Sequence, residues 1–66
     1  MKIYLNGEEK EITGPLTVAG LLEIFSIDTR KVAVEKNLEI VSKSIYPSEP
    51  VNEGDRIEIV HFIGGG

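Results

Sequence analysis

No cysteine occurs in this chain of 66 residues and its one histidine is His61, so neither a disulfide nor a structural metal site is available to hold the fold together. A domain of this length buries only about 60% of the surface that its unfolded chain exposes. Hydrophobic residues make up 41% of the sequence, a proportion typical of a folded domain and not of a disordered segment. The chain must therefore fold as one small domain around an apolar core, which leaves no interior for a deep ligand pocket.

The charge pattern argues against two classes of partner. Eleven Asp and Glu outweigh seven Lys and Arg, which gives a net charge of −4, and the basic residues are scattered along the chain. A nucleic-acid binder normally carries a basic stripe that neutralises phosphates. The sequence also lacks the run of about 20 apolar residues that spans a bilayer, and its first residues lack the apolar run of a signal peptide. We therefore expect a cytoplasmic protein that binds neither nucleic acid nor membrane.

The first half of the chain predicts a hairpin followed by a break. Residues 2–6 alternate between apolar and polar side chains, as a strand with one buried face does. Asn6–Gly7 supplies the positive φ angles of a tight hairpin turn, and residues 8–13 follow as a polar return strand. Gly14–Pro15 ends that strand.

A short helix is predicted over residues 18–26. Thr17 precedes it and is a good N-cap, because its hydroxyl can accept a hydrogen bond from a free backbone N–H of the first turn. Apolar residues then recur with helical spacing on a single stripe, at Val18, Leu21, Leu22 and Phe25.

The second half predicts further strands. Residues 31–35 form the third strand and residues 40–41 a short fourth strand. Residues 42–52 contain two prolines and are predicted to form an irregular connector with a helical turn near 44–46. After a turn at Gly54–Asp55, residues 56–63 form the longest strand. This order predicts an α+β domain with one sheet and one helix across one face.

Candidate catalytic groups are sparse. The carboxylate pairs Glu8–Glu9 and Glu53–Asp55 adjoin predicted turns, where acidic residues are usually solvated surface groups. His61 follows two buried strand positions and is predicted to lie at the rim of the core in a structural role. No convergent set of metal ligands and no nucleophile beside a base is evident. We therefore expect no catalytic residue, no metal site and no enzyme activity in this chain.

The last strand predicts an exposed apolar face. If Ile57 and Ile59 face the helix, alternate residues of the sheet point to the opposite side, which no helix covers. The side chains predicted there include those of Tyr4, Ala33, Glu58, Val60 and Phe62. A cluster of Tyr4, Val60 and Phe62 would be a partner-binding face, or alternatively a partly shielded second apolar cluster.

The sequence ends on Gly64, Gly65 and Gly66. Glycines at a chain end contribute no packing and lose the most entropy when they are ordered. One interpretation is a frayed end or an expression remnant. The other is an arm of about 10 Å that threads a channel too narrow for side chains and presents its terminal carboxylate as an unhindered reaction centre.

Together these features resemble the ThiS family, the sulfur carriers of thiamine biosynthesis, which have a ubiquitin-like β-grasp fold. The residues that carry the resemblance are Thr17–Val18 with Leu21–Leu22, Val32–Ala33–Val34, Asn37, Ile40–Val41, Gly54–Asp55 and the ending from His61 to Gly66. The resemblance implies a mixed sheet of four to five strands with one helix across one face. It divides the chain into a β-grasp domain at 1–63 and a flexible glycine tail at 64–66. One departure is Ser42–Lys43, where the family often has Pro-Arg.

The resemblance also implies a mechanism in which the catalytic groups belong to partners. A ThiF-like adenylating enzyme would use ATP and magnesium to adenylate the Gly66 carboxylate. A cysteine desulfurase relay would then supply sulfur, and a ThiG-like thiazole synthase would consume the resulting thiocarboxylate. Gly65 and Gly66 match the reactive diglycine and Gly64 extends the arm, while the carrier binds no cofactor and is monomeric when free.

Three alternatives remain open at this point. The small subunit of molybdopterin synthase has the same fold and a terminal diglycine, and sulfur carriers for tRNA thiolation or ubiquitin-like tags are similar. A protein of another class, a non-reactive β-grasp interaction module, would lose nothing when the tail is removed.

Overall fold

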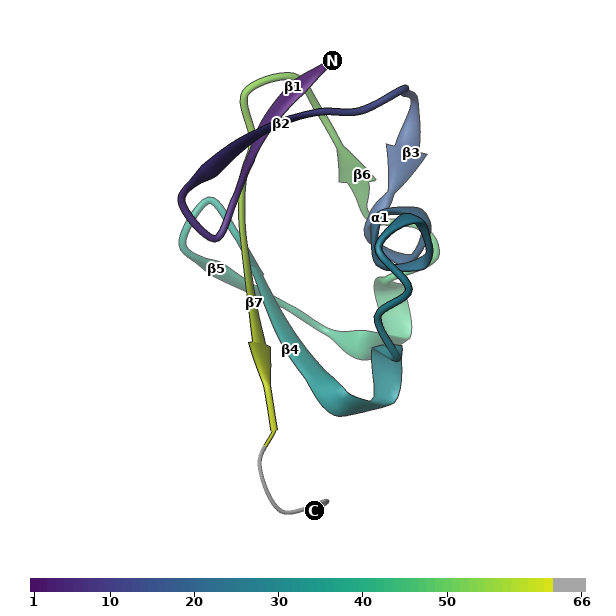
Figure 1. Ribbon diagram of the computed structural model, residues 1–66. Coiled ribbons are helices and arrows are strands. Elements are labelled where there is room, and N and C mark those ends of the chain that lie inside the picture. The colour runs from purple at the N-terminus through teal and green to yellow at the C-terminus, as the bar shows by residue number, and fades with distance from the viewer. Residues whose placement is uncertain (63–66) are drawn as a thin grey trace.

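A mixed sheet of five strands curves around one short helix in the computed structural model, which describes residues 1–62 (Figure 1). The spatial order of the sheet is β2-β1-β7-β4-β5. Its strands are β1 (Lys2–Leu5), β2 (Glu8–Glu11), β4 (Val32–Lys36), β5 (Glu39–Val41) and β7 (Arg56–His61). The helix α1 (Val18–Ile24) crosses one face of the sheet, and no helix formed by residues 1–62 covers the other face (Figure 1).

The last strand lies in the middle of the sheet. β7 pairs in parallel with β1, where Leu5 lies opposite Ile57, and antiparallel with β4, where Val34 lies opposite Ile59. The Asn6 side chain continues the first pairing, because Ile59 N–H donates to its Oδ1 at 2.7 Å and its Nδ2 donates to the Ile59 carbonyl at 3.3 Å. β7 is therefore held on both sides.

The predicted hairpin turn is present. Asn6 and Gly7 have φ angles of 49° and 83°, the left-handed values that a tight turn between two strands requires. The strand that follows ends at Glu11, two residues before its predicted end.

The helix begins where the sequence predicts and ends earlier. The Thr17 side chain caps the first turn of α1 (Val18–Ile24). The predicted end at residue 26 is wrong because Ser26 adopts a left-handed φ of 56°. Ile27 N–H then donates to the Leu22 carbonyl at 2.9 Å, which closes the helix as a Schellman motif.

Several short elements are absent from the sequence-based prediction. The helical turn predicted within residues 42–52 is present as the 3₁₀ turn η2 (Lys43–Ile45), but the sequence does not predict the strand β6 (Pro50–Val51) that follows it. β6 pairs antiparallel with β3 (Leu16–Thr17), and a further 3₁₀ turn, η1 (Thr29–Lys31), precedes β4. A strand of two residues shows no alternation in sequence, so only its distant partner defines it.

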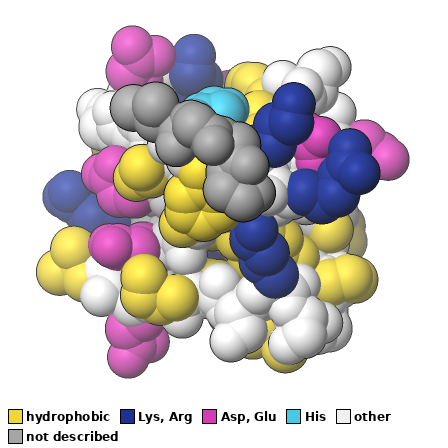
Figure 2. Space-filling view, turned by 90° about the horizontal axis from the view of Figure 1, so that it is seen from below, with side chains coloured by type: hydrophobic (Ala, Val, Ile, Leu, Met, Phe, Trp, Pro, Cys, Tyr) yellow, Lys and Arg dark blue, Asp and Glu magenta, His cyan; other side chains and the backbone are white. Residues whose placement is uncertain are grey.

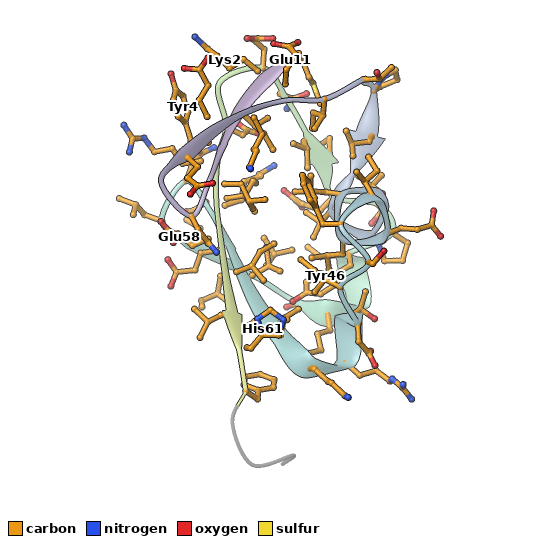
Figure 3. The ribbon with its side chains drawn as sticks, in the orientation of Figure 1. Lys2, Tyr4, Glu11, Tyr46, Glu58 and His61 are labelled. Atoms are coloured by element: carbon orange, nitrogen blue, oxygen red, sulfur yellow. The ribbon has the colours of Figure 1, made fainter. Side chains whose placement is uncertain are left out.

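The core lies between α1 and the inner face of the sheet (Figure 3). Its fully buried large side chains are Ile3, Leu21, Leu22, Ile57, Val18, Val32 and Val34. Tyr46, from the connector after η2, is also buried, and its ring points toward the core below α1 (Figure 3). All core residues are apolar apart from the tyrosine hydroxyl, as expected for a small domain without a disulfide.

Candidate functional site

The helix-free face of the sheet carries the alternation that the sequence predicts. In β7, Ile57 and Ile59 are buried, whereas the Val60 side chain is 60% exposed. Val60 lies opposite Ala33 of β4, and Ile40 of β5 is also largely exposed. The part of the sheet beside the end of β7 therefore presents apolar side chains to solvent.

Two carboxylates interrupt this apolar surface. Glu35 of β4 lies directly opposite Glu58 of β7, two register positions from the Ala33–Val60 pair and on the same face. Neither carboxylate is among the ion pairs formed within residues 1–62. The left side of Figure 2, which corresponds to the helix-free face, accordingly shows acidic and apolar side chains together.

Tyr4 lies apart from the other predicted face residues. It pairs with Arg56 at the start of β7. Arg56 precedes Val60 by four residues, which is about 13 Å along a strand. The Tyr4 ring lies between two cations, with Lys2 Nζ 5.9 Å and the Arg56 guanidinium carbon 5.6 Å from its centroid. The structure therefore places Tyr4 on the expected face but does not bring it together with Val60 and Phe62. Figure 3 shows Tyr4 at the opposite end of the sheet from His61, the last residue of β7.

Phe62 lies just beyond the end of β7, beside the two 3₁₀ turns. Its N–H donates to the Lys31 carbonyl at 2.8 Å, so its backbone is anchored to η1. Its ring is half-exposed and lies beneath the ammonium of Lys43, with Nζ 4.9 Å from the ring centroid. Seen from below, Lys and Arg side chains border the apolar side chains of this end of the molecule (Figure 2). Sequence reasoning identified Lys43 only as a departure from a family pattern and did not predict this contact.

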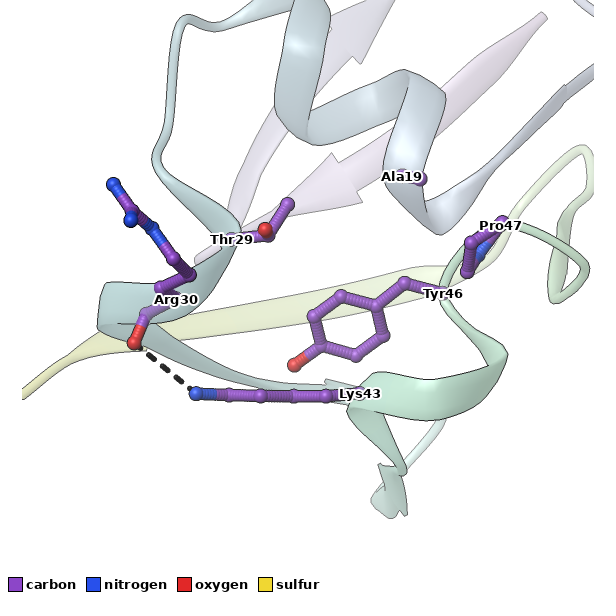
Figure 4. Close-up of a pocket in the computed structure, with 6 residues that line it drawn as sticks. All are labelled: Ala19, Thr29, Arg30, Lys43, Tyr46 and Pro47. Atoms are coloured by element: carbon purple, nitrogen blue, oxygen red, sulfur yellow. Dashed lines mark hydrogen bonds between the residues drawn. The ribbon is translucent and has the colours of Figure 1, made fainter.

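A shallow hollow of about 290 Å³ opens next to Lys43 (Figure 4). Its lining residues are Ala19, Thr29, Arg30, Lys43, Tyr46 and Pro47. Burial raises the pKa of Tyr46 above its ordinary value of 10.0, and a hydrogen bond with the Val34 backbone opposes that rise. The hollow thus offers an apolar floor and two cations at its rim, but no nucleophile beside a base.

Arg30 at this rim is already paired. Its guanidinium makes a two-bond contact with the Asp28 carboxylate at 3.1 and 2.9 Å. This hydrogen-bonded pair lowers the pKa of Asp28 from 3.8 to about 2 and raises the pKa of Arg30. The Asp28 side chain also accepts a hydrogen bond from Arg30 N–H at 2.9 Å and caps η1, so the pair holds this turn in shape.

The acidic residues near turns are surface groups, as predicted, because Glu8, Glu9 and Glu53 are exposed and Asp55 is half-buried. Glu8 pairs with Lys10 at 3.3 Å, and Glu53 accepts a hydrogen bond from the Lys2 N–H at 3.0 Å. Asp55 accepts hydrogen bonds from backbone and side-chain groups of the neighbouring turns. Within residues 1–62 no group of three or more His, Asp or Glu side chains is placed to hold a metal ion.

The other predicted site residues are Gly64, Gly65 and Gly66, which lie outside the described residues. His61 is exposed and lies opposite the buried Val32, on the strand face of Ile57 and Ile59, which agrees with its predicted place at the rim of the core. None of the helices within the described part of the chain has the length and apolar character needed to cross a membrane.

Comparison with known proteins identifies the family. The model of the ThiS family matches residues 3–66, which is nearly the whole chain. The chain belongs to the ThiS family. The predicted membership is confirmed, and the ThiS protein of Geobacter metallireducens, a thiamine biosynthesis protein of known crystal structure, supports the predicted β-grasp fold. It superposes with a TM-score of 0.87 at 30% identity, over 100% of both chains.

The curated relatives include one protein of about this chain's length and two much longer proteins. The sulfur carrier protein ThiS of Bacillus subtilis is 40% identical over 67 residues, which cover 97% of this chain and 98% of that protein. A thiazole synthase of Paramagnetospirillum magneticum is 56% identical over 66 residues, but this chain spans only 20% of its length. The thiazole synthase of Magnetococcus marinus is matched likewise, at 47% identity over 20% of its length. The Bacillus subtilis relative, which has this chain's own size, is a sulfur carrier protein, in agreement with the predicted carrier role.

Proposed function

We propose that this ThiS-family domain carries sulfur for the formation of the thiazole of thiamine, and that the sulfur is attached at the Gly66 carboxylate. The observation that carries the proposal is the family match, which extends through the three terminal glycines. The likeness to the Bacillus subtilis sulfur carrier over nearly its full length supports the same function.

The proposed chemistry begins with activation, because a carboxylate is a poor electrophile. An adenylating enzyme of the ThiF type, using ATP and magnesium, transfers AMP to the Gly66 carboxylate and releases pyrophosphate. The terminal sulfur of a persulfide on a cysteine desulfurase relay attacks the acyl carbon, and AMP leaves. A thiol of the relay then cleaves the acyl disulfide, which leaves a thiocarboxylate on Gly66 and a disulfide on the relay.

The carrier's own contribution is to bind these partners and to present its arm. Val60 and Phe62 lie next to the point where residues 63–66 begin, so we assign them to the surface that contacts the adenylating enzyme. Tyr4, at the other end of β7, belongs to that surface only if the partner covers the whole sheet. Thiazole synthases that contain a matching segment support association with a ThiG-like thiazole synthase. In this proposal the domain is monomeric when free, acts in the cytoplasm and holds no cofactor.

Deletion of Gly65 and Gly66 tests the proposal. ATP–pyrophosphate exchange by the adenylating enzyme of the same organism should be lost with the truncated protein. Its circular dichroism and thermal unfolding should match those of the intact protein, because the core is built from residues before position 63. Exchange that persists with the truncated protein would show that the tail is not the reacting group and would favour a non-reactive interaction module.

Intact-mass measurement identifies the product. After incubation with ATP, the adenylating enzyme and a sulfur donor, the mass of the carrier should rise by the difference between sulfur and oxygen. Purified thiazole synthase should then remove that increment, whereas the large subunit of molybdopterin synthase should not. Removal by the second protein alone would reassign the pathway, and removal by neither would favour a tRNA-thiolation carrier.

A further inference from the structure

Lys43 lies where three segments that are distant in sequence meet. It begins η2, and its Nζ donates a hydrogen bond of 3.1 Å to the carbonyl oxygen of Arg30 in η1 (Figure 4). The same Nζ lies 4.9 Å from the centroid of the Phe62 ring. Phe62 is itself tied to η1 through its hydrogen bond to the Lys31 carbonyl. One ammonium group thus links η1, η2 and the residue that follows the last strand.

No carboxylate competes for this ammonium within residues 1–62. The ion pairs of that part of the chain involve the N-terminus, Lys10, Arg30 and Lys36, and Lys43 is not among them. Asp28, the acidic residue of η1, is taken up by the two-bond contact with Arg30. The charge of Lys43 is therefore balanced by a carbonyl dipole and an aromatic face, a contact worth about 0.5–1 kcal/mol at an exposed site.

The orientation of Phe62 depends on this contact. Its ring is 51% exposed and is not part of the core, so burial alone does not select one rotamer. The hydrogen bond to η1 holds its backbone nitrogen, and the cation above the ring holds its side chain.

We propose that Lys43 is a positioning residue that holds the Phe62 ring in one orientation and so preorganises the surface that the adenylating enzyme contacts. The inference rests on the proposed function, in which the Gly66 carboxylate reacts in a partner's active site. Lys43 touches none of the reacting atoms. The contact with Lys43 already restricts the Phe62 side chain in the free carrier. Less conformational entropy is then lost when the partner binds, which favours affinity.

Substitution of Lys43 should therefore affect KM and leave kcat unchanged. Lys43→Met keeps the length of the side chain and removes its charge. In steady-state adenylation it should raise the KM for the carrier about two- to five-fold, the change that a contact of about 0.5–1 kcal/mol produces. Lys43→Arg should keep the wild-type KM, because a guanidinium also donates to a carbonyl and stacks on an aromatic ring.

Lys31→Met is the matched control. It removes one positive charge from the same end of the molecule, and the Lys31 side chain has no hydrogen bond or ion pair within residues 1–62. Its KM should stay at the wild-type value. An equal rise of KM in both Met variants would assign the effect to net charge and overturn the role of Lys43. An unchanged KM in Lys43→Met would also overturn it.

A double-mutant cycle with Phe62→Leu tests the coupling itself. If Lys43 acts through the ring, the effects of Lys43→Met and Phe62→Leu on KM should be strongly non-additive. Additive effects would refute the contact.

Proton chemical shifts of the Phe62 ring provide a test that needs no partner. They should move in Lys43→Met and not in Lys31→Met. Unchanged ring shifts in Lys43→Met would overturn the positioning role even if the carrier is active. If the ring signals shift in Lys43→Met but the wild-type carrier is never adenylated, the contact is supported and the proposed function is wrong.

Discussion

The opposite faces of β7 allow fold and partner binding to be tested on one strand. Val60 points to the helix-free face and is 60% exposed, whereas Ile57, three residues earlier, is fully buried. Val60→Ala removes two methyl groups from the proposed partner surface. Ile57→Val removes one from the core, and both changes are small enough for the domain to fold.

The exposed fraction of Val60 sets the size of the expected effect. Two buried methyl groups are worth about 1.6 kcal/mol in all, at about 0.8 kcal/mol each. Because 60% of Val60 is exposed, about 1 kcal/mol of this burial free energy remains to be gained when a partner covers the residue. Val60→Ala should therefore weaken binding about five-fold. The remaining part of Val60 is already buried in the free carrier. Val60→Ala should therefore lower the free energy of unfolding by about 0.6 kcal/mol, or the Tm by about 2–5 °C.

Ile57→Val should show the opposite pattern. Removing one methyl group from a filled core costs about 0.5–1.5 kcal/mol of unfolding free energy. Because Ile57 has no exposed surface, the Kd for the partner should be unchanged at a temperature where the variant is fully folded.

Isothermal titration calorimetry with the adenylating enzyme gives both dissociation constants, and thermal unfolding gives both stabilities. An unchanged Kd in Val60→Ala would remove this face from the interface. Equal weakening by Ile57→Val would mean that affinity follows overall stability and not a particular surface.

Two further predictions concern charges. Glu58→Gln removes one of two carboxylates that face each other across β7 and β4, a like-charge pair that destabilises by about 0.2–1 kcal/mol. It should therefore raise the free energy of unfolding in low salt, and the gain should shrink in high salt. Glu9→Gln, opposite Tyr4 and not opposite a carboxylate, is the control, and an equal gain there would contradict the reasoning. Asp28 has a folded pKa of about 2 against an ordinary value of 3.8, so its stabilising contribution is present above pH 3.8 and is lost as the pH falls toward 2. The Tm of Asp28→Asn should accordingly lie below that of the wild type at neutral pH, and the difference should close over this acidic range; a constant difference would contradict the assignment.

Local patterns in the sequence were sufficient for several elements. Asn6–Gly7 correctly predicts the first turn, because two successive positive φ angles strongly favour this pair. Thr17 correctly predicts the start of α1, because its own hydroxyl caps the helix. The alternation along β7 correctly predicts that Ile57 and Val60 lie on opposite faces, since a strand turns each successive side chain over.

Other features could not be read from local patterns. The end of α1 at Ile24 depends on Ser26, a non-glycine residue in a left-handed conformation that its propensity does not favour. The pairing of β3 with β6 joins residues more than thirty positions apart. The alternation of side chains along the first strand correctly predicts that Tyr4 lies on the helix-free face. Its distance from Val60, however, follows from the register between β1 and β7.

The absence of cysteine determined that the domain is held by its core alone, and that any sulfur it carries is not on a thiol of its own. The glycines at the end of the sequence likewise mark the reactive arm in the proposed function without any structure, because their lack of side chains is itself the signal. Only the tertiary structure decided what surrounds the base of that arm. It brings Lys43 to Phe62 across a gap of 19 residues in sequence, because η2 and the end of β7 both pack against η1.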